Sequence, residues 1–131
     1  MDTRNKIIDS QTAVEIAGRL RRQGRKLVVV TGHFDVVLAA HARDLEAVRS
    51  SSGADAIMVI LQPLSLSLLA APARAELVAA LAMVDYVVSA GDDSLDELLS
   101  RLPAERVISR LGADDELKRL LIEHVQSRHS L

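Results

Sequence analysis

The stretch KLVVVTGHFDVVLAAHARDLEAVR, residues 26–49, decides the fold because it passes from a strand pattern to a helix pattern through one short turn. Residues 26–30 form a β-branched apolar run, which predicts a buried strand. Residues 39–50 carry apolar side chains three and four apart, which predicts a helix. Gly32 lies in the turn between the two. This strand–glycine–helix order is typical of a parallel sheet covered by helices.

The same alternation continues along the rest of the chain. Further strands are predicted at 56–61, 85–89 and 106–109, and further helices at 12–23, 72–81, 94–101 and 114–127. Gly24 is placed to end the first helix, and Ser94 with Glu97 forms a capping box for the helix at 94–101. Residues 62–71 leave two alternatives open, an edge strand or a loop, because prolines bracket them.

Alternating short strands and amphipathic helices predict right-handed βαβ units. The expected fold class is therefore α/β, a three-layer Rossmann-like fold with a parallel sheet and helices on both faces. No internal repeat or linker divides the 131 residues, so we expect a single domain spanning 1–131.

The composition narrows the function classes. The chain is 49% hydrophobic and 26% charged, which indicates a globular protein. One Tyr and one Phe leave no stacking platform for single-stranded nucleic acid, and the formal charge of −2 gives no reason to expect a nucleic-acid partner. The absence of cysteine excludes disulfides, thiolate catalysis and Cys-ligated zinc. No apolar run, the one at 56–61 included, is long enough for a bilayer, so we expect a cytoplasmic protein without a membrane partner.

A basic cluster stands apart from this balanced composition. It comprises Arg19, Arg21, Arg22, Arg25 and Lys26. Two interpretations are open, a solvated helix end whose cations complement the helix dipole and a phosphate-binding patch. The spacing favours the solvated helix end.

The turn after residues 26–30 is the first candidate for chemistry, because ligands of such sheets bind outside the carboxyl ends of the strands. Gly32 allows close approach of the backbone, and His41 at a helix N-terminus adds a donor to the free amides there. Together they suit a phosphate. The alternative is a loop glycine chosen for positive φ beside a capping or surface histidine.

Two blocks in this sequence resemble the cytidylyltransferase-like nucleotidyltransferase superfamily. The family pattern of strand, G-x-F-D-x-x-H-x-G-H and helix is matched by Gly32, Phe34, Asp35 and His41 in register. RAELVAALAMVDYV at 74–87 is similar to the family segment R-A-E-x-x-A-A-L-x-x-V-D-Y-V. The resemblance spans roughly residues 6 to 110 and is strongest to heptose-1-phosphate adenylyltransferases, with glycerol-3-phosphate cytidylyltransferases nearby.

This resemblance implies transfer of AMP or CMP from a nucleoside triphosphate to a small sugar or alcohol phosphate, with Mg²⁺ bound together with the triphosphate. His41 would be the catalytic residue, Asp35 would organise the loop and Arg74 would neutralise substrate charge. The implied nucleotide-binding residues are Thr31, Gly32, His33, Phe34, Asp35, His41, Arg74 and Arg110. Arg110 would take the place of a family lysine. No resident metal site is predicted, because Asp92, Asp93 and Asp96 lack calcium-loop spacing and suit helix capping.

The sequence also departs from the family pattern. Leu38 and Ala40 replace the first histidine and the glycine of H-x-G-H, and residues 62–73 contain no charge. Losing one preorganised donor typically lowers a rate about 10²–10³-fold. We therefore expect activity to be reduced or lost. The alternative is a catalytically degenerate relative acting as a binding or oligomer-partner module, with Leu64, Leu66, Leu68 and Leu69 forming a homo-oligomer contact instead of completing the core.

Overall fold

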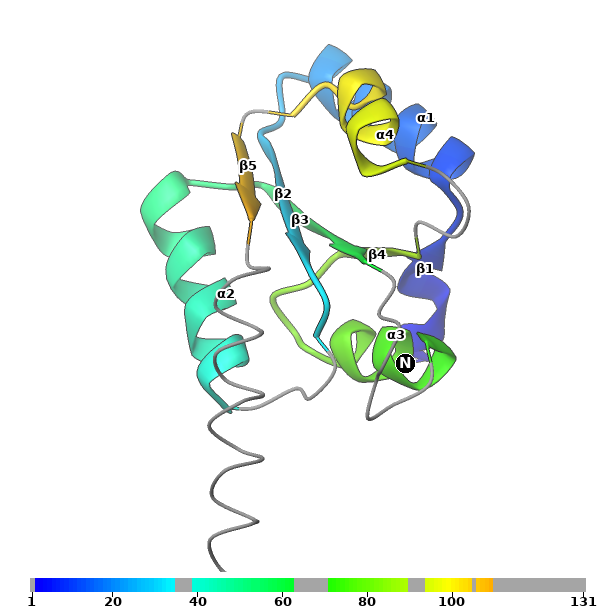
Figure 1. Ribbon diagram of the computed structural model, residues 1–131. Helices are drawn as coiled ribbons and strands as arrows, with labels where there is room; N and C mark the ends of the chain where they lie inside the picture. The colour runs from blue at the N-terminus through cyan, green and yellow to red at the C-terminus, as the bar shows by residue number, and fades with distance from the viewer. Residues whose placement is uncertain (1, 35–38, 63–70, 90–93, 105, 110–131) are drawn as a thin grey trace, which may run out of the picture.

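A five-stranded, all-parallel sheet is the middle layer of the computed structural model, which describes residues 2–34, 39–62, 71–89, 94–104 and 106–109 (Figure 1). In order across the sheet the strands are β1 (Ile7–Ile8), β4 (Tyr86–Ser89), β3 (Ala56–Leu61), β2 (Leu27–Gly32) and β5 (Arg106–Ser109). The helices are the 3-10 turn η1 (Thr3–Lys6), α1 (Ser10–Arg22), α2 (Ala39–Ser52), α3 (Ala71–Ala79) and α4 (Leu95–Arg101). The predicted three-layer Rossmann-like α/β fold is confirmed.

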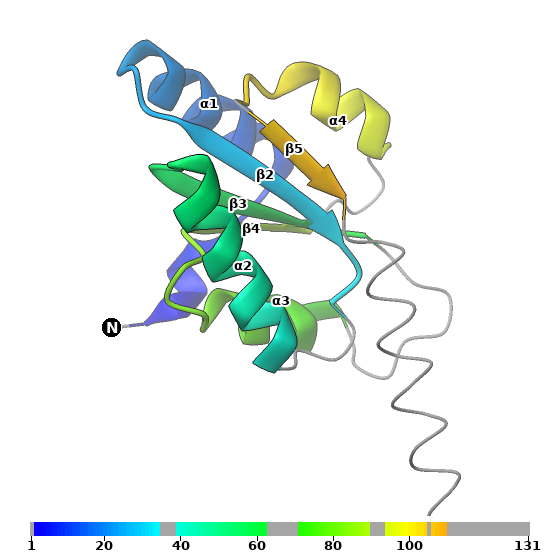
Figure 2. The same cartoon turned by 90° about the vertical axis from the view of Figure 1, so that its left-hand side faces the viewer.

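Helices cover both faces of the sheet, α1 and α4 on one side and α2 and α3 on the other (Figure 2). Side chains of β2 and β3 alternate between the two layers, so that Val29 and Met58 pack toward α1 and α4 while Val28 and Ile57 pack toward α2 and α3. Every residue of β2 and β3 is buried. This explains why these strands are continuous apolar runs without a polar alternation.

The strand order reverses at β2. From β2 the chain steps to β3 and then to β4 in one direction, and it then crosses back to place β5 on the other side of β2. Thr31 is in register with Ser109 of β5, and Gly32 with Leu61 of β3. In such sheets ligands bind in the crevice that the reversal opens at the carboxyl ends of the strands, here beside β2.

The ends of α1 explain why the chain turns into β2 where it does. The Asp9 carboxylate accepts a hydrogen bond from the amide of Thr12 at 2.7 Å, which caps the helix start. At the other end Gly24 adopts φ 70°, and the amides of Gly24 and Arg25 donate to the carbonyls of Arg21 and Leu20. This pair of bonds is a Schellman motif. The prediction that Gly24 ends the helix is confirmed.

Several local predictions need correction. The two-residue edge strand β1, which pairs Ile7 and Ile8 with Val87 and Val88, was not predicted. Ser94 is the N-cap residue of α4, but the predicted capping box is wrong, because its side chain makes no capping bond and only its carbonyl accepts from the Leu98 amide. The positive-φ alternative for Gly32 is also wrong, because Gly32 is the last residue of the extended strand β2.

Other predictions fall outside the described residues, namely the helix at 114–127 and the leucines of the 62–71 segment. Within the described ranges, no helix is both long and apolar enough to cross a membrane.

Candidate functional site

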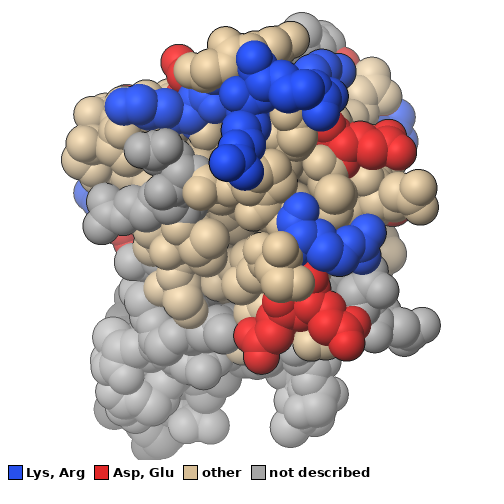
Figure 3. All heavy atoms as spheres, turned by 90° about the horizontal axis from the view of Figure 1, so that it is seen from above, with Lys and Arg blue, Asp and Glu red and all other residues tan. Residues whose placement is uncertain are grey.

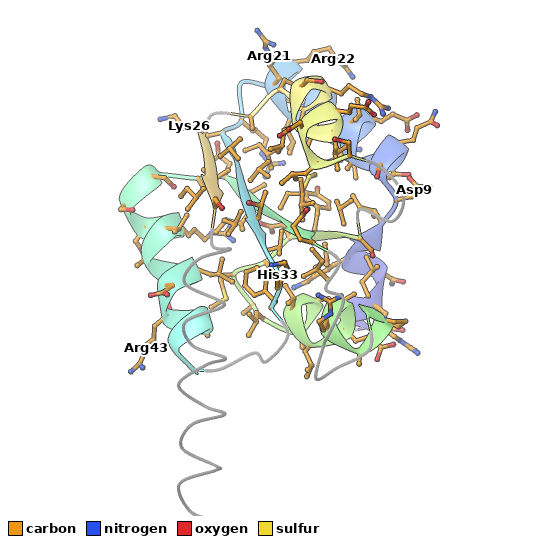
Figure 4. All side chains as sticks on the ribbon, viewed as in Figure 1. Asp9, Arg21, Arg22, Lys26, His33 and Arg43 are labelled. Atoms are coloured by element: carbon orange, nitrogen blue, oxygen red, sulfur yellow. The ribbon has the colours of Figure 1, made fainter. Side chains whose placement is uncertain are left out.

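The carboxyl end of β2 brings four of the predicted site residues into one short segment. Thr31 and Gly32 are the last two residues of the strand, and His33 and Phe34 follow directly. Figure 4 shows His33 at this end of β2, between the sheet and α3. Thr31 is only 2% exposed, so its hydroxyl lies inside the protein.

Phe34 has a strained backbone. Its φ is 50°, which makes it the non-glycine residue with positive φ among the described residues. Its ring is 1% exposed and packs in the core beneath α2 and α3. A left-handed conformation costs a bulky L-residue roughly 1–2 kcal/mol, and burial of the ring supplies the compensating energy. Backbone strain of this kind is concentrated at functional sites, which favours a functional role for the turn.

Arg74 of α3 joins the ends of β2 and β3. Its Nη1 donates to the main-chain carbonyl of His33 at 2.8 Å and to that of Gln62 at 3.0 Å. The Gln62 amide in turn donates to the Gly32 carbonyl at 2.8 Å, and His33 Nδ1 lies 3.4 Å from the Gln62 carbonyl oxygen. The guanidinium therefore fixes the path of both chains as they leave the sheet.

Two buried donors at this rim lack acceptors. The Nε of Arg74 and the Nε2 of Gln62 find no hydrogen-bond acceptor in the structure as described. Arg74 is 3% exposed, and neither of the ion pairs found among the described residues includes it. A buried cation without a counter-ion is costly, and so is a buried donor without an acceptor. The arrangement is suited to an anionic ligand whose oxygen accepts from Nε.

Sequence reasoning predicted Arg74 as a site residue but missed its burial and missed Gln62. A signal for the burial of Arg74 was present, because Arg74 lies four residues before Val78, on the same stripe of α3 that buries Ala75 and Ala79. Gln62 carried no comparable signal. It is one polar residue after a strand and before a proline.

The remaining predicted residues are placed only in part. The backbone of His41 lies in the first turn of α2, and α2 begins on the carboxyl side of the sheet as a phosphate-binding helix would (Figure 1). Asp35 and Arg110 lie outside the described residues. No cluster of three or more His, Cys, Asp or Glu that could hold a metal ion occurs in the described ranges.

A scan against protein-family models finds no match for this chain, and no curated protein matches its sequence. The fold and the rim together define the class as an α/β protein of three-layer Rossmann-like architecture, with a buried arginine that joins the ends of β2 and β3 and leaves its Nε without an acceptor. The likeness to nucleotidyltransferases therefore remains a resemblance carried by the two sequence blocks.

Proposed function

We propose that this chain is a nucleotidyltransferase-family protein that binds a nucleoside triphosphate at the carboxyl rim of β2 and β3. The reaction would be transfer of AMP or CMP to a small sugar or alcohol phosphate, with activity reduced or lost. The observation that carries the proposal is Arg74, a buried guanidinium that pairs with no carboxylate among the described residues and whose Nε has no acceptor, beside the strand-order reversal. A phosphoryl oxygen is the acceptor that such a donor fits.

The proposed site works by position and charge. Arg74 Nε and Gln62 Nε2 would donate to phosphate oxygens, and the amides at the start of α2 would add the favourable end of the helix dipole. His41, in the first turn of α2, is the proposed catalytic donor. Mg²⁺ would arrive with the triphosphate and neutralise part of its charge.

Two features support reduced catalysis. Leu38 and Ala40 stand where the family pattern has a histidine and a glycine. In addition, the Nη1 of Arg74 already donates hydrogen bonds to two main-chain carbonyls. It is therefore not available to stabilise the charge that develops on a transferring phosphoryl group. The second candidate function is therefore a degenerate relative that binds nucleotide weakly or not at all and serves as a binding or oligomer-partner module.

Calorimetric titration of ATP and of CTP, each with Mg²⁺, tests binding. Micromolar binding that weakens about tenfold or more in Arg74→Lys would support the proposal, because lysine keeps the charge and lacks Nε. Arg101→Lys is the matched control, an exposed arginine in the last turn of α4. Absence of binding to either nucleotide would remove the nucleotide site altogether.

Release of pyrophosphate with a panel of sugar and alcohol phosphates then separates the two candidate functions. Turnover would rule out the degenerate form. If nucleotide binds without turnover, the double change Leu38→His with Ala40→Gly should raise affinity and restore measurable release. No effect of that double change would contradict the family assignment of the 31–41 segment.

A further inference from the structure

A basic cavity lies at the opposite end of the sheet from the candidate site. It has a volume of about 450 Å³ and is formed where α1 turns into β2 and where the chain approaches β5. Arg21, Arg25 and Lys26 line it together with Gly24, and Pro103 and Ala104 form its other wall. Figure 3 shows basic side chains gathered across this end of the molecule, and Figure 4 places Arg21 and Lys26 there.

The three cations of this basic cavity lie together without a carboxylate partner among the described residues. In the part of the chain that the structure describes, none of them forms an ion pair with a carboxylate, and no acidic residue lines the cavity. Asp55, the nearby carboxylate, accepts a hydrogen bond from the main-chain amide of Lys26 at 2.7 Å. Like charges gathered around one concavity repel one another, so an anion inside it would stabilise the arrangement.

The end of helix α1 does not account for the cluster. A helix C-terminus carries the equivalent of about half a negative charge, whereas three cations surround the cavity. The carbonyls of Leu20 and Arg21 are moreover already occupied by the Schellman bonds from Arg25 and Gly24. The sequence favoured the interpretation of these cations as a solvated helix end. The structure shows in addition that three of them line one cavity.

We propose that this basic cavity binds a small organic molecule carrying two or more phosphate charges. Its volume lies in the range of small-ligand sites, and three cations match two to three negative charges. The side chains of Arg21, Arg25 and Lys26 supply all the donors, because the turn amides are already bonded. Pro103 and Ala104 offer an apolar wall for the organic part.

Titration of isotope-labelled protein with pyrophosphate, followed by amide NMR, tests the proposal. Saturable shifts are expected at Gly24, Arg25 and Ala104 at submillimolar to millimolar concentrations and should weaken with added salt. The double variant Arg25→Gln with Lys26→Gln should weaken this affinity about tenfold or more, since each lost charge-assisted bond costs several-fold. Arg43→Gln, an exposed arginine of α2 at the other end of the molecule, should bind as the parent does (Figure 4).

Arg74→Lys separates this proposal from the nucleotide site. It should leave the shifts at Gly24, Arg25 and Ala104 unchanged even where it abolishes nucleotide binding at the opposite rim. Absence of shifts at these three amides up to millimolar pyrophosphate would overturn the proposal. Equal affinity in the parent and in the Arg25→Gln/Lys26→Gln variant would overturn it as well.

Discussion

Replacing Arg74 by methionine tests whether the guanidinium holds the rim together. Methionine fills a similar volume and keeps the apolar stem, but it removes both Nη1 hydrogen bonds to the carbonyls of His33 and Gln62. Those carbonyls belong to the residues that directly follow β2 and β3. The substitution therefore acts on the candidate site and on the stability of the fold together.

The expected loss follows from the contacts. A hydrogen bond from a charged donor stabilises a protein by about 1.5–3 kcal/mol, so the two bonds set an upper bound of about 3–6 kcal/mol. The change also removes the unpaired buried Nε, whose desolvation costs about 1–3 kcal/mol. We therefore expect Arg74→Met to lower the free energy of unfolding by about 2–4 kcal/mol.

Urea unfolding followed by circular dichroism measures this loss. Arg74→Lys should lose less, because an ammonium group still donates to a carbonyl. Arg101→Met, at an exposed position of α4, should change the free energy of unfolding by no more than about 0.5 kcal/mol. If Arg74→Met is as stable as the parent protein, the guanidinium does not support the rim.

Three further predictions concern stability. Gly18→Ala in α1 should stabilise the protein by about 0.5–1 kcal/mol, since the new methyl meets only the tip of Arg22 at 3.4 Å. Gly24→Ala should instead destabilise it by about 1–2 kcal/mol, because Gly24 has a φ of 70°. Urea unfolding of the two variants measures both changes. Asp85→Ala should cost about 1–2 kcal/mol by the same assay, because the Asp85 carboxylate accepts from the Ile57 amide at 2.9 Å; an unchanged midpoint would contradict this. The hydrogen bond from Thr12 lowers the pKa of Asp9 below its usual 3.8. The ionised carboxylate therefore stabilises the fold above pH 3.8, and this stabilisation is lost as the pH falls through the lowered pKa. The Tm advantage of the parent over Asp9→Asn should shrink in acid, and a Tm difference that stays constant with pH would refute this prediction.

The central part of the fold was predictable because its elements are decided by local patterns. β3 and β5 have the predicted bounds, whereas β2, predicted at 26–30, begins at Leu27 and continues to Gly32. Strands buried on both faces are apolar throughout, which leaves a strong signal in the sequence. The edge strand β1 has two residues, too few for any periodicity, and it is recognisable only through its pairing with β4.

The candidate site was predictable in position but not in its interactions. The glycine turn after β2 pointed to the carboxyl rim of the sheet, where the structure places residues 31–34, because parallel topology brings the carboxyl ends of the strands together. The roles of the side chains depend on contacts between distant segments. Arg74 holds a carbonyl 41 residues earlier in the chain, and no local pattern encodes such a bond. The strain at Phe34 is likewise set by packing, since a phenylalanine does not favour positive φ on its own.

If the rim binds a nucleotide as proposed, its electrostatics favour binding over transfer. Phosphoryl transfer without a covalent intermediate depends on preorganised donors that gain interaction energy only as charge develops. At this rim the described cation is Arg74, and two of its bonds are committed to main-chain carbonyls that the fold needs. Its free Nε would contact a ground-state phosphate as readily as a transition state, and such uniform binding lowers a dissociation constant without raising a rate. Under the proposed function, the protein should therefore still bind nucleotide where turnover is low or lost. A variant that regains turnover must regain hydrogen-bond donors in the 38–41 segment and not at Arg74.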